Sequence, residues 1–382
     1  MPIGPFSDRG PLRVQPFFGF RNSDRLFLSA RALHSHEPTF ENRGFFGDLK
    51  TMLSQYASHE VEGLEIEFGF ETASGHSIRE TAISGPEGFV QFEVDLPANT
   101  DLPFKTGWEK AALRWGARAD EHEAGDVPAH ILAPGRDAGI GIISDIDDTI
   151  LETGITGDIR AIARNWKRVM AQMPEEREIV PGARGFYSAL GGRHGTEAGD
   201  DGIPQSRPRP VFYVSSSPWN LYSYLVEFQR LRDMPLGPIM LRDWGFNRKT
   251  LGSESHGSHK RAAIERIIRQ YPHLRFALVG DDTQKDLVAF GEIAASMPDR
   301  IAAVFIRRIS SEAPNQAEQS ARDAIKAAGV PFWMGADYNE ARAMLTDAGL
   351  EFDSKVETLV KTASEGKDAA SRAAPAAGTT GE

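Results

Sequence analysis

Apolar and polar residues alternate along several short segments in the first third of the chain. The alternation is clear over residues 24–33, 63–70 and 89–96, and a turn rich in Gly and Pro precedes the last of them. A repeat of two residues is typical of a β-strand that buries one face. Residues 111–116 fit a further strand, and several short strands separated by turns predict a small all-β sandwich over residues 1–135.

The pattern changes near residue 139, where short apolar runs begin to alternate with segments of helical periodicity. This alternation predicts strands joined by helices, and therefore a mostly parallel sheet with helices on both faces. The predicted strands are 139–144, 211–214, 238–242, 275–279, 301–306 and 331–334, and the predicted helices are 158–173, 183–190, 218–232, 259–270 and 338–348. We therefore expect an α/β fold, a Rossmann-like parallel sheet, over residues 137–350. Residues 365–382, rich in Ala, Gly, Ser and Thr, predict a disordered tail.

Composition narrows the class of protein. The 382 residues are 40% hydrophobic and 25% charged, as expected for a globular chain, and the length predicts two or three domains. A formal net charge of -11 argues against nucleic-acid binding. Cys is absent, which excludes disulfides, zinc–thiolate sites and thiol nucleophiles. No apolar run is long enough for a transmembrane segment and the N-terminus lacks a secretory pattern, so we expect a cytoplasmic protein whose membrane contact, if it has any, is peripheral.

The end of the first predicted α/β strand carries three carboxylates, Asp145, Asp147 and Asp148, followed by Thr149. Buried charge without a partner is costly, so packing alone does not explain them. A site that holds a divalent cation and attacks a phosphorus centre does require such groups: one carboxylate as nucleophile and metal ligand, another as proton donor and acceptor. An acidic turn with an incidental cation is the alternative.

Polar residues also follow the second and fourth predicted strands of this region. Each group has an ordinary explanation, such as a helix cap, a turn or a solvated lysine. The carboxyl ends of parallel strands meet at one edge of a sheet, however, so together these groups predict a phosphoryl-transfer site. They are Ser215, Ser216, Ser217 and Asn220 after the second strand, Gly280, Asp281, Asp282 and Asp286 after the fourth, and Lys260 in the helix before it.

These motifs, in this order, resemble those of the haloacid dehalogenase superfamily of aspartate-nucleophile phosphatases. More closely, DIDDTILETGI (145–155), YVSSSPWN (213–220) and LRDWG (241–245) are similar to the actin-patch-associated phosphatidate phosphatase family, which is related to the catalytic domain of lipins. The resemblance covers about 137–348 and implies a sheet of the haloacid dehalogenase type. The short stretch between Thr149 and the second strand implies a minimal cap.

The resemblance also assigns catalytic roles. Asp145 would be the nucleophile that forms an aspartyl-phosphate, and Asp147 would protonate the leaving oxygen and then activate water. Ser215 would donate to the phosphate, and Lys260 would offset negative charge. The Asp145 side chain, the Asp147 carbonyl oxygen and Asp281 would bind Mg²⁺, a cation that prefers oxygen ligands.

Further residues are expected around this centre. Asp282 and Asp286 are candidates for outer contacts to the metal, direct or through water. Ser216, Asn220 and Arg242 are candidates for contacts with the substrate.

The function expected from these residues is a Mg²⁺-dependent phosphatase that hydrolyses a phosphomonoester. Conversion of phosphatidate to diacylglycerol at a membrane surface is one candidate reaction, and aromatic and basic residues at the rim could then contact the lipid. They are Trp219, Trp244, Phe246, Arg230, Arg232, Arg242 and Arg248. A phosphatase of a soluble metabolite or phosphoprotein, and a non-catalytic lipid- or phosphate-binding module, remain alternatives. The sequence does not tell which proteins, if any, are partners.

Overall fold

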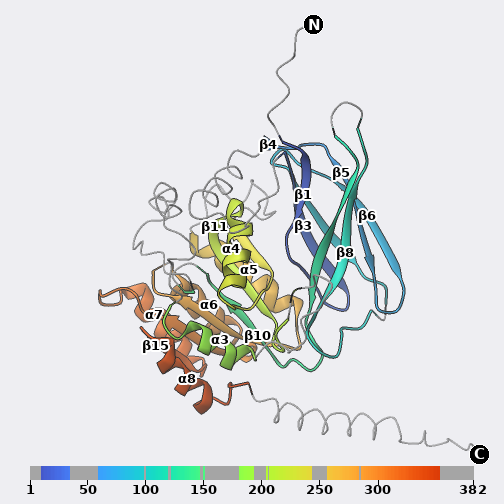
Figure 1. Cartoon of the computed structure of the whole chain (residues 1–382). Coiled ribbons are helices and arrows are strands. Elements are labelled where there is room, and N and C mark those ends of the chain that lie inside the picture. Colours follow the sequence, from blue (N-terminus) through green and yellow to red (C-terminus); the bar gives the residue numbers. More distant parts are fainter. Residues whose placement is uncertain are drawn as a thin grey trace, which may run out of the picture.

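The chain folds around two β-sheets that lie side by side (Figure 1). The computed structural model describes residues 10–34, 59–98, 100–118, 122–146, 149–150, 180–192, 204, 206–242, 256–283 and 285–352; at 218, 220, 242 and 256–259 it describes the backbone only. The predicted helix 158–173 and the predicted tail 365–382 lie outside these ranges.

The N-terminal sheet contains nine strands within the described residues. Their order is β1-β3-β2-β9-β8-β5-β6, with β4 and β7 also paired to β3. All pairs are antiparallel except β2 with β9, so the sheet is mixed. The strands are β1 (Leu12–Pro16), β2 (Gly19–Arg21), β3 (Arg25–His34), β4 (His59–Glu60), β5 (Glu65–Glu71), β6 (Ser77–Ile83), β7 (Phe89–Asp95), β8 (Gly107–Trp115) and β9 (Gly125–Ala133).

The four strands predicted by alternation correspond to β3, β5, β7 and β8 and are confirmed. β6 and β9 escaped prediction for local reasons. β6 (SIRETAI) is almost entirely polar, and β9 (GDVPAHILA) contains a proline, which argues against a strand in a sequence. The arrangement of two separate sheets in a sandwich stays a prediction, because the described strands are joined by hydrogen bonds into one sheet.

The second sheet is entirely parallel and has the order β12-β11-β10-β13-β14-β15. Counted along the chain within this sheet, the order is 3-2-1-4-5-6, which defines a doubly wound α/β fold. The order reverses between β10 and β13, where such sheets bind ligands beyond the carboxyl ends of the strands. The six strands, all predicted, are β10 (Ile140–Ser144), β11 (Val211–Pro218), β12 (Ile239–Arg242), β13 (Arg275–Asp281), β14 (Ile301–Arg307) and β15 (Phe332–Gly335).

Helices connect these strands. The described ones are α3 (Ala183–Gly191), η1 (Trp219–Leu221), α4 (Tyr222–Leu231), α5 (His256–Gln270), α6 (Asp286–Ser296), η2 (Pro298–Arg300), α7 (Gln316–Ala327) and α8 (Tyr338–Asp347). α6 and α7 were not predicted: α6 is apolar almost all round, whereas α7 buries only Ala321 and Ile325. None of the helices that the structure describes has the length and apolar character needed to cross a bilayer.

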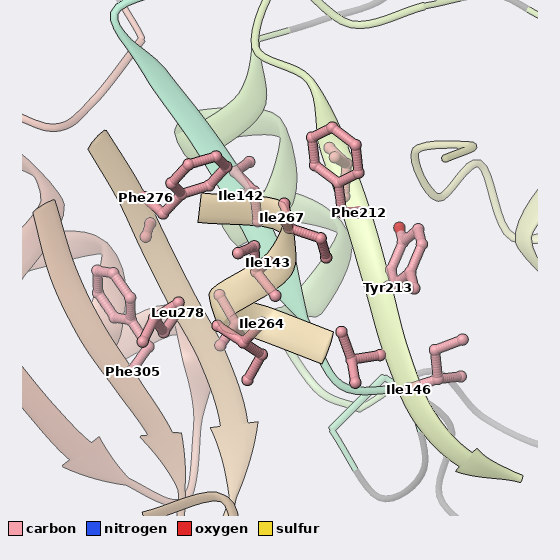
Figure 2. Close-up of a cluster of buried hydrophobic side chains, with 14 of the residues drawn as sticks. Ile142, Ile143, Ile146, Phe212, Tyr213, Ile264, Ile267, Phe276, Leu278 and Phe305 are labelled. Atoms are coloured by element: carbon pink, nitrogen blue, oxygen red, sulfur yellow. The ribbon is translucent and has the colours of Figure 1, made fainter. Parts of the chain in front are cut away.

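One hydrophobic core reaches from the parallel sheet into the N-terminal sheet. Figure 2 shows its centre, where Ile142 and Ile143 of β10 lie between side chains of β11, β13 and β14, with Ile264 and Ile267 of α5 against them. Phe212 of β11 then continues the core across the boundary: its ring meets that of Phe20 on β2 edge to face, with centroids 5.9 Å apart.

Polar contacts reinforce this boundary. The Phe18 amide donates to the Tyr222 hydroxyl at 2.7 Å, and the Tyr271 hydroxyl donates to the Arg21 carbonyl at 3.2 Å. The two sheets therefore pack directly against each other and share one core.

Candidate functional site

The strand register brings the predicted polar groups to one edge of the parallel sheet. Ser144, the last residue of β10, pairs with Tyr213 on β11 and with Val279 on β13. Asp145 follows this row by one residue, and Ser215 and Asp281 follow it by two. All three are almost completely buried, at 2%, 1% and 0% exposure. The point where the strand order reverses is therefore lined by a hydroxyl and two carboxyl groups that water does not reach.

Asp145 is held by contacts from three directions. Its amide donates to the Val279 carbonyl at 2.8 Å, which fixes the backbone against β13. Its carboxylate accepts a hydrogen bond from Lys260 Nζ at 2.9 Å. The Thr149 hydroxyl lies 3.5 Å from Asp145 Oδ2 and 3.2 Å from Asp281 Oδ2, and so links the ends of β10 and β13.

The Lys260 side chain reaches this centre because of the helical period. Lys260, Ile264 and Ile267 are spaced i, i+4 and i+7 and share one face of α5. Packing of the two isoleucines onto the sheet, visible in Figure 2, turns the lysine toward the strand ends as well. Lys260 is 3% exposed and makes a second, short ion pair with Asp286.

Asp281 and Asp286 form the other half of the centre. Thr283 donates to Asp281 Oδ1 from its amide and from its hydroxyl, both at 2.6 Å, and thereby orients that carboxyl group. Asp286, the first residue of α6, accepts from the Asp281 amide at 3.3 Å. A Cβ at Gly280 would lie 2.5 Å from Asp286 Oδ2, so the glycine of the predicted Gly-Asp motif makes room for the acid of α6.

The electrostatics of this group call for another cation. Burial and the neighbouring Asp286 raise the pKa of Asp281 to about 7, although Lys260 acts in the opposite direction. Burial would lower the pKa of Lys260, but Asp145, Asp286 and Asp281 together raise it well above its ordinary value. Three buried carboxyl groups therefore share one ammonium group, and a second positive charge would offset the repulsion between them.

The donor set fits a hard divalent cation. One carboxylate oxygen from each of Asp145, Asp281 and Asp286 lies within 4.8 Å of the other two. Carboxylate oxygens are the ligands that Mg²⁺ and Ca²⁺ take in proteins. Asp286 was expected only in an outer contact, and the structure places its carboxylate in the same group of three as Asp145 and Asp281.

Ser215 lies in the bulged end of β11, where the register with β12 shifts between Val214 and Pro218. Its hydroxyl accepts a hydrogen bond from the Ser217 amide at 2.9 Å, so the strand turns tightly around it. Ser216 between them is half-buried. The backbones of Asn220 and Arg242 belong to η1 and β12, and their side chains lie outside what the structure describes, as does all of Asp147.

Asp282 lies apart from the carboxylate cluster. Its Oδ1 accepts from the amides of Ile309 and Ser310 at 2.8 and 3.1 Å and ties the end of β14 to that of β13. Its role as an outer metal contact stays a prediction. Ser144 and Tyr187, which the sequence did not single out, lie directly beneath the site: their hydroxyls are hydrogen-bonded and the Ser144 hydroxyl also donates to the Asp145 carbonyl. No local motif marks Tyr187, because it reaches Ser144 only through the packing of α3.

The fold is a doubly wound α/β fold, and a lysine and a group of buried carboxylates lie where its strand order reverses. This arrangement defines an α/β protein with an acidic site suited to binding a cation. Comparison with known proteins agrees. Residues 140–308 match the family described as phosphatidate phosphatase APP1, catalytic domain. This part of the chain is similar to that family, and the resemblance deduced from the motifs is confirmed.

Two relatives extend this finding. Phosphatidate phosphatase APP1 of Saccharomyces cerevisiae (strain ATCC 204508 / S288c) is 32% identical over 195 residues, which are 50% of this chain and 30% of that protein. An uncharacterized protein of Schizosaccharomyces pombe (strain 972 / ATCC 24843) is 29% identical over 175 residues, 46% of this chain and 26% of that one. The matches thus span less than a third of either relative. Among solved structures, the chitinase ChiW from Paenibacillus sp. str. FPU-7 aligns with 86% of this chain and with 31% of its own chain. The sequence identity is 10% and the TM-score is 0.20, which is too low to indicate a shared fold.

Proposed function

We propose that this protein is a Mg²⁺-dependent phosphoric monoester hydrolase that works through an aspartyl-phosphate on Asp145. The observation that supports this most strongly is the position of the Asp145 carboxylate. It is buried at the strand reversal, paired with Lys260 and within reach of Asp281 and Asp286. A carboxylate can approach a phosphate dianion only where positive charge offsets their repulsion.

In the proposed reaction an Asp145 oxygen forms a bond to phosphorus while the bond from phosphorus to the ester oxygen breaks. The departing oxygen takes its proton from Asp147, by the role that the resemblance implies. Water, deprotonated by Asp147, then attacks the aspartyl-phosphate and releases inorganic phosphate together with the free Asp145 carboxylate. The Ser215 hydroxyl and the Lys260 ammonium would donate to the phosphoryl oxygens.

Asp145, Asp281 and Asp286 would hold Mg²⁺, joined by the Asp147 carbonyl that the resemblance assigns. A bound Mg²⁺ supplies charge neutralisation for the carboxylate and the phosphate. Thr283 and Thr149 orient the carboxyl groups for this role, because their hydroxyls donate to Asp281.

Replacing Asp145 by Asn tests the nucleophile. The amide keeps the size of the side chain but cannot attack phosphorus, so hydrolysis of a soluble aryl phosphate should fall at least a thousandfold, on the order of other lost nucleophiles. Asp337→Asn is the matched control, because Asp337 caps α8 through its Oδ1 and Asn caps equally well. An Asp145→Asn protein that turns over at the wild-type rate would refute the mechanism.

Chelation tests the metal. Activity should disappear in EDTA and return with Mg²⁺, whereas Ca²⁺ should restore little, because it takes more ligands at longer distances. Full activity in chelator would remove the cation from the proposal.

The substrate is proposed from the relative whose name is phosphatidate phosphatase. Arg230, which is exposed, and Arg232, which is half-buried, lie at the C-terminal end of α4. Because α4 starts beside the carboxyl end of β11 and leads back to the start of the parallel strand β12, these two arginines lie at the opposite edge of the sheet from Asp145 and do not form the basic rim expected from the sequence. Phosphatidate should be hydrolysed in mixed micelles, and vesicles containing phosphatidate should carry the protein upward in a flotation assay. Turnover of soluble phosphomonoesters without turnover of phosphatidate or flotation would favour a metabolite or phosphoprotein as substrate.

A further inference from the structure

A buried arginine of the N-terminal sheet contacts the short helix η1, which follows the strand end with the proposed phosphate-binding serine. Arg31 lies on β3 and is 1% exposed. Its guanidinium carbon lies 2.9 Å from the ring centroid of Trp219, the first residue of η1. Trp219 comes directly after the strand end that carries Ser215 and Ser217.

The Trp219 ring is held by a cross-strand pair. Arg31 on β3 is directly opposite Phe89 on β7, and its guanidinium lies 5.0 Å from the Phe89 ring. Phe89 meets the Trp219 ring edge to face, with centroids 5.5 Å apart. Two neighbouring strands of the N-terminal sheet therefore hold one side chain of η1, directly after β11.

Arg31 is itself fixed before it meets Trp219. Its Nε donates to the Glu87 carbonyl at 2.6 Å and its Nη2 to Glu60 at 3.0 Å. Nη1 has no hydrogen-bond partner among the described residues. Burial lowers the pKa of Arg31 to about 10, so it is still charged at neutral pH. The guanidinium plane is thus oriented by two hydrogen bonds and remains available for stacking on an indole face.

The contact bears on the site through a short stretch of backbone. Ser215 accepts from the Ser217 amide, and the strand then runs through Pro218 into Trp219 and α4. Whatever fixes the Trp219 ring therefore fixes the exit of the turn that positions the Ser215 hydroxyl. A displacement of about 1 Å in such a turn can cost about a hundredfold in rate.

We propose that Arg31 is a positioning residue: through Trp219 the N-terminal sheet sets the geometry of the phosphate-binding turn of β11. This inference rests on the proposed phosphatase function and gives the N-terminal sheet a part in it. A stack made only for stability would not need a guanidinium, because an apolar side chain of similar size packs without the cost of burying a charge.

The test compares Arg31→Gln with Arg21→Gln. Arg21 is also 1% exposed and is also paired with an acid, Glu109. It lies on β2, and its other guanidinium hydrogen bonds go to the carbonyl oxygens of Asn22 and Asp101. Both variants should lose stability. At a temperature where both are folded, Arg31→Gln should lower kcat/KM for a soluble aryl phosphate by about ten- to a hundredfold, and Arg21→Gln by no more than about twofold.

Two further readouts separate positioning from mere destabilisation. The pH profile of Arg31→Gln should keep its midpoints, because no group at the reaction centre has been changed. Arg31→Gln combined with Trp219→Ala should be no slower than Trp219→Ala alone, since both changes break one contact.

Equal kcat/KM for the two glutamine variants, or additive losses in the double variant, would overturn the positioning role while leaving the phosphatase in place. A wild-type protein that hydrolyses no phosphomonoester with Mg²⁺ would overturn the proposed function and this inference together.

Discussion

At the scale of the residue, the main feature of the site is a group of buried charged side chains that depend on one another. Lys260 contacts both Asp145 and Asp286, and all three side chains are at most 4% exposed. Removing one partner of a buried ion pair is more costly than never having built it, because the other charge stays in the interior.

We therefore expect Lys260→Met to lower the free energy of unfolding in the absence of divalent cations by about 3–5 kcal/mol. Added Mg²⁺ should recover part of this loss, since it would replace the missing positive charge. Urea unfolding with and without Mg²⁺ measures both effects, and Lys326→Met on the exposed face of α7 is the control. A Lys260→Met protein as stable as the wild type without Mg²⁺ would contradict this view of the cluster.

Tyr187 is linked to Asp145 through the Ser144 hydroxyl. Its hydroxyl is bonded to that of Ser144, which donates to the Asp145 carbonyl, and burial raises its pKa well above the ordinary range. Tyr187→Phe should cost about 1 kcal/mol of stability and lower kcat several-fold with little change in KM. Tyr338→Phe is the matched control, because the buried Tyr338 hydroxyl has no hydrogen-bond partner within the described ranges. Equal kinetics for the two variants would show that the Tyr187 hydroxyl does not orient Asp145, the proposed nucleophile.

The sequence marked Asp145, Ser215, Lys260 and Asp281 from their places beside predicted strands, and the structure brings three of them to one edge with the lysine among them. It did not separate Asp282 from Asp286. Only the start of α6 decides which of two neighbouring acids faces Lys260, and α6 has no amphipathic pattern to reveal it.

At the scale of the element, the junction of β13 and α6 is the tightest part of the site. A Cβ on Gly280 would approach Asp286 Oδ2 to 2.5 Å and the ring of Phe290 to 2.9 Å. Neither neighbour can retreat easily, because Asp286 is paired with Lys260 and Phe290 is 1% exposed.

Gly280→Ala should therefore displace Asp286, cost about 1–3 kcal/mol of stability and weaken Mg²⁺ binding. Calorimetric titration with Mg²⁺ measures the affinity. Gly139→Ala, at the start of β10, introduces the same methyl group where nothing lies within 4 Å and should change neither quantity. Wild-type affinity in Gly280→Ala would place Asp286 outside the metal site.

At the scale of the whole molecule, two properties depend on the fold as a unit: its response to pH and the coupling of its sheets. The pKa of Asp281 is raised to about 7, whereas an unfolded Asp titrates near 4. The folded state without metal thus holds a proton that the unfolded state has released, so its stability falls as pH rises from about 4 to about 7.

Bound Mg²⁺ should remove this loss, because it favours the ionised carboxylate. The rise in melting temperature on adding Mg²⁺ should accordingly be larger at pH 8 than at pH 6, where binding must first displace a proton. Thermal unfolding at both pH values measures the difference. Asp281→Asn should abolish it, and an equal Mg²⁺ effect at both pH values in the wild type would contradict the raised pKa.

The shared core predicts that both sheets unfold together. Phe20 of the N-terminal sheet is 0% exposed and packs against Phe27 and against Phe212 of the parallel sheet. Phe20→Ala should lower the free energy of unfolding by about 3–5 kcal/mol and keep a single cooperative transition. Two transitions, with only the first shifted, would show that the sheets fold separately.

The sequence by itself determined the six parallel strands and the resemblance to a phosphatidate phosphatase family, because each depends on a local signal: a short apolar run or a motif at a strand end. The tertiary structure alone decided what no local signal encodes. Strand order placed Asp145 beside Asp281 across more than a hundred residues, packing turned Asp286 and not Asp282 toward Lys260, and the contact of two sheets set Arg31 on Trp219. Contacts between residues far apart in the sequence depend on which surfaces the whole chain can bury at the same time, and this is a property of the folded molecule.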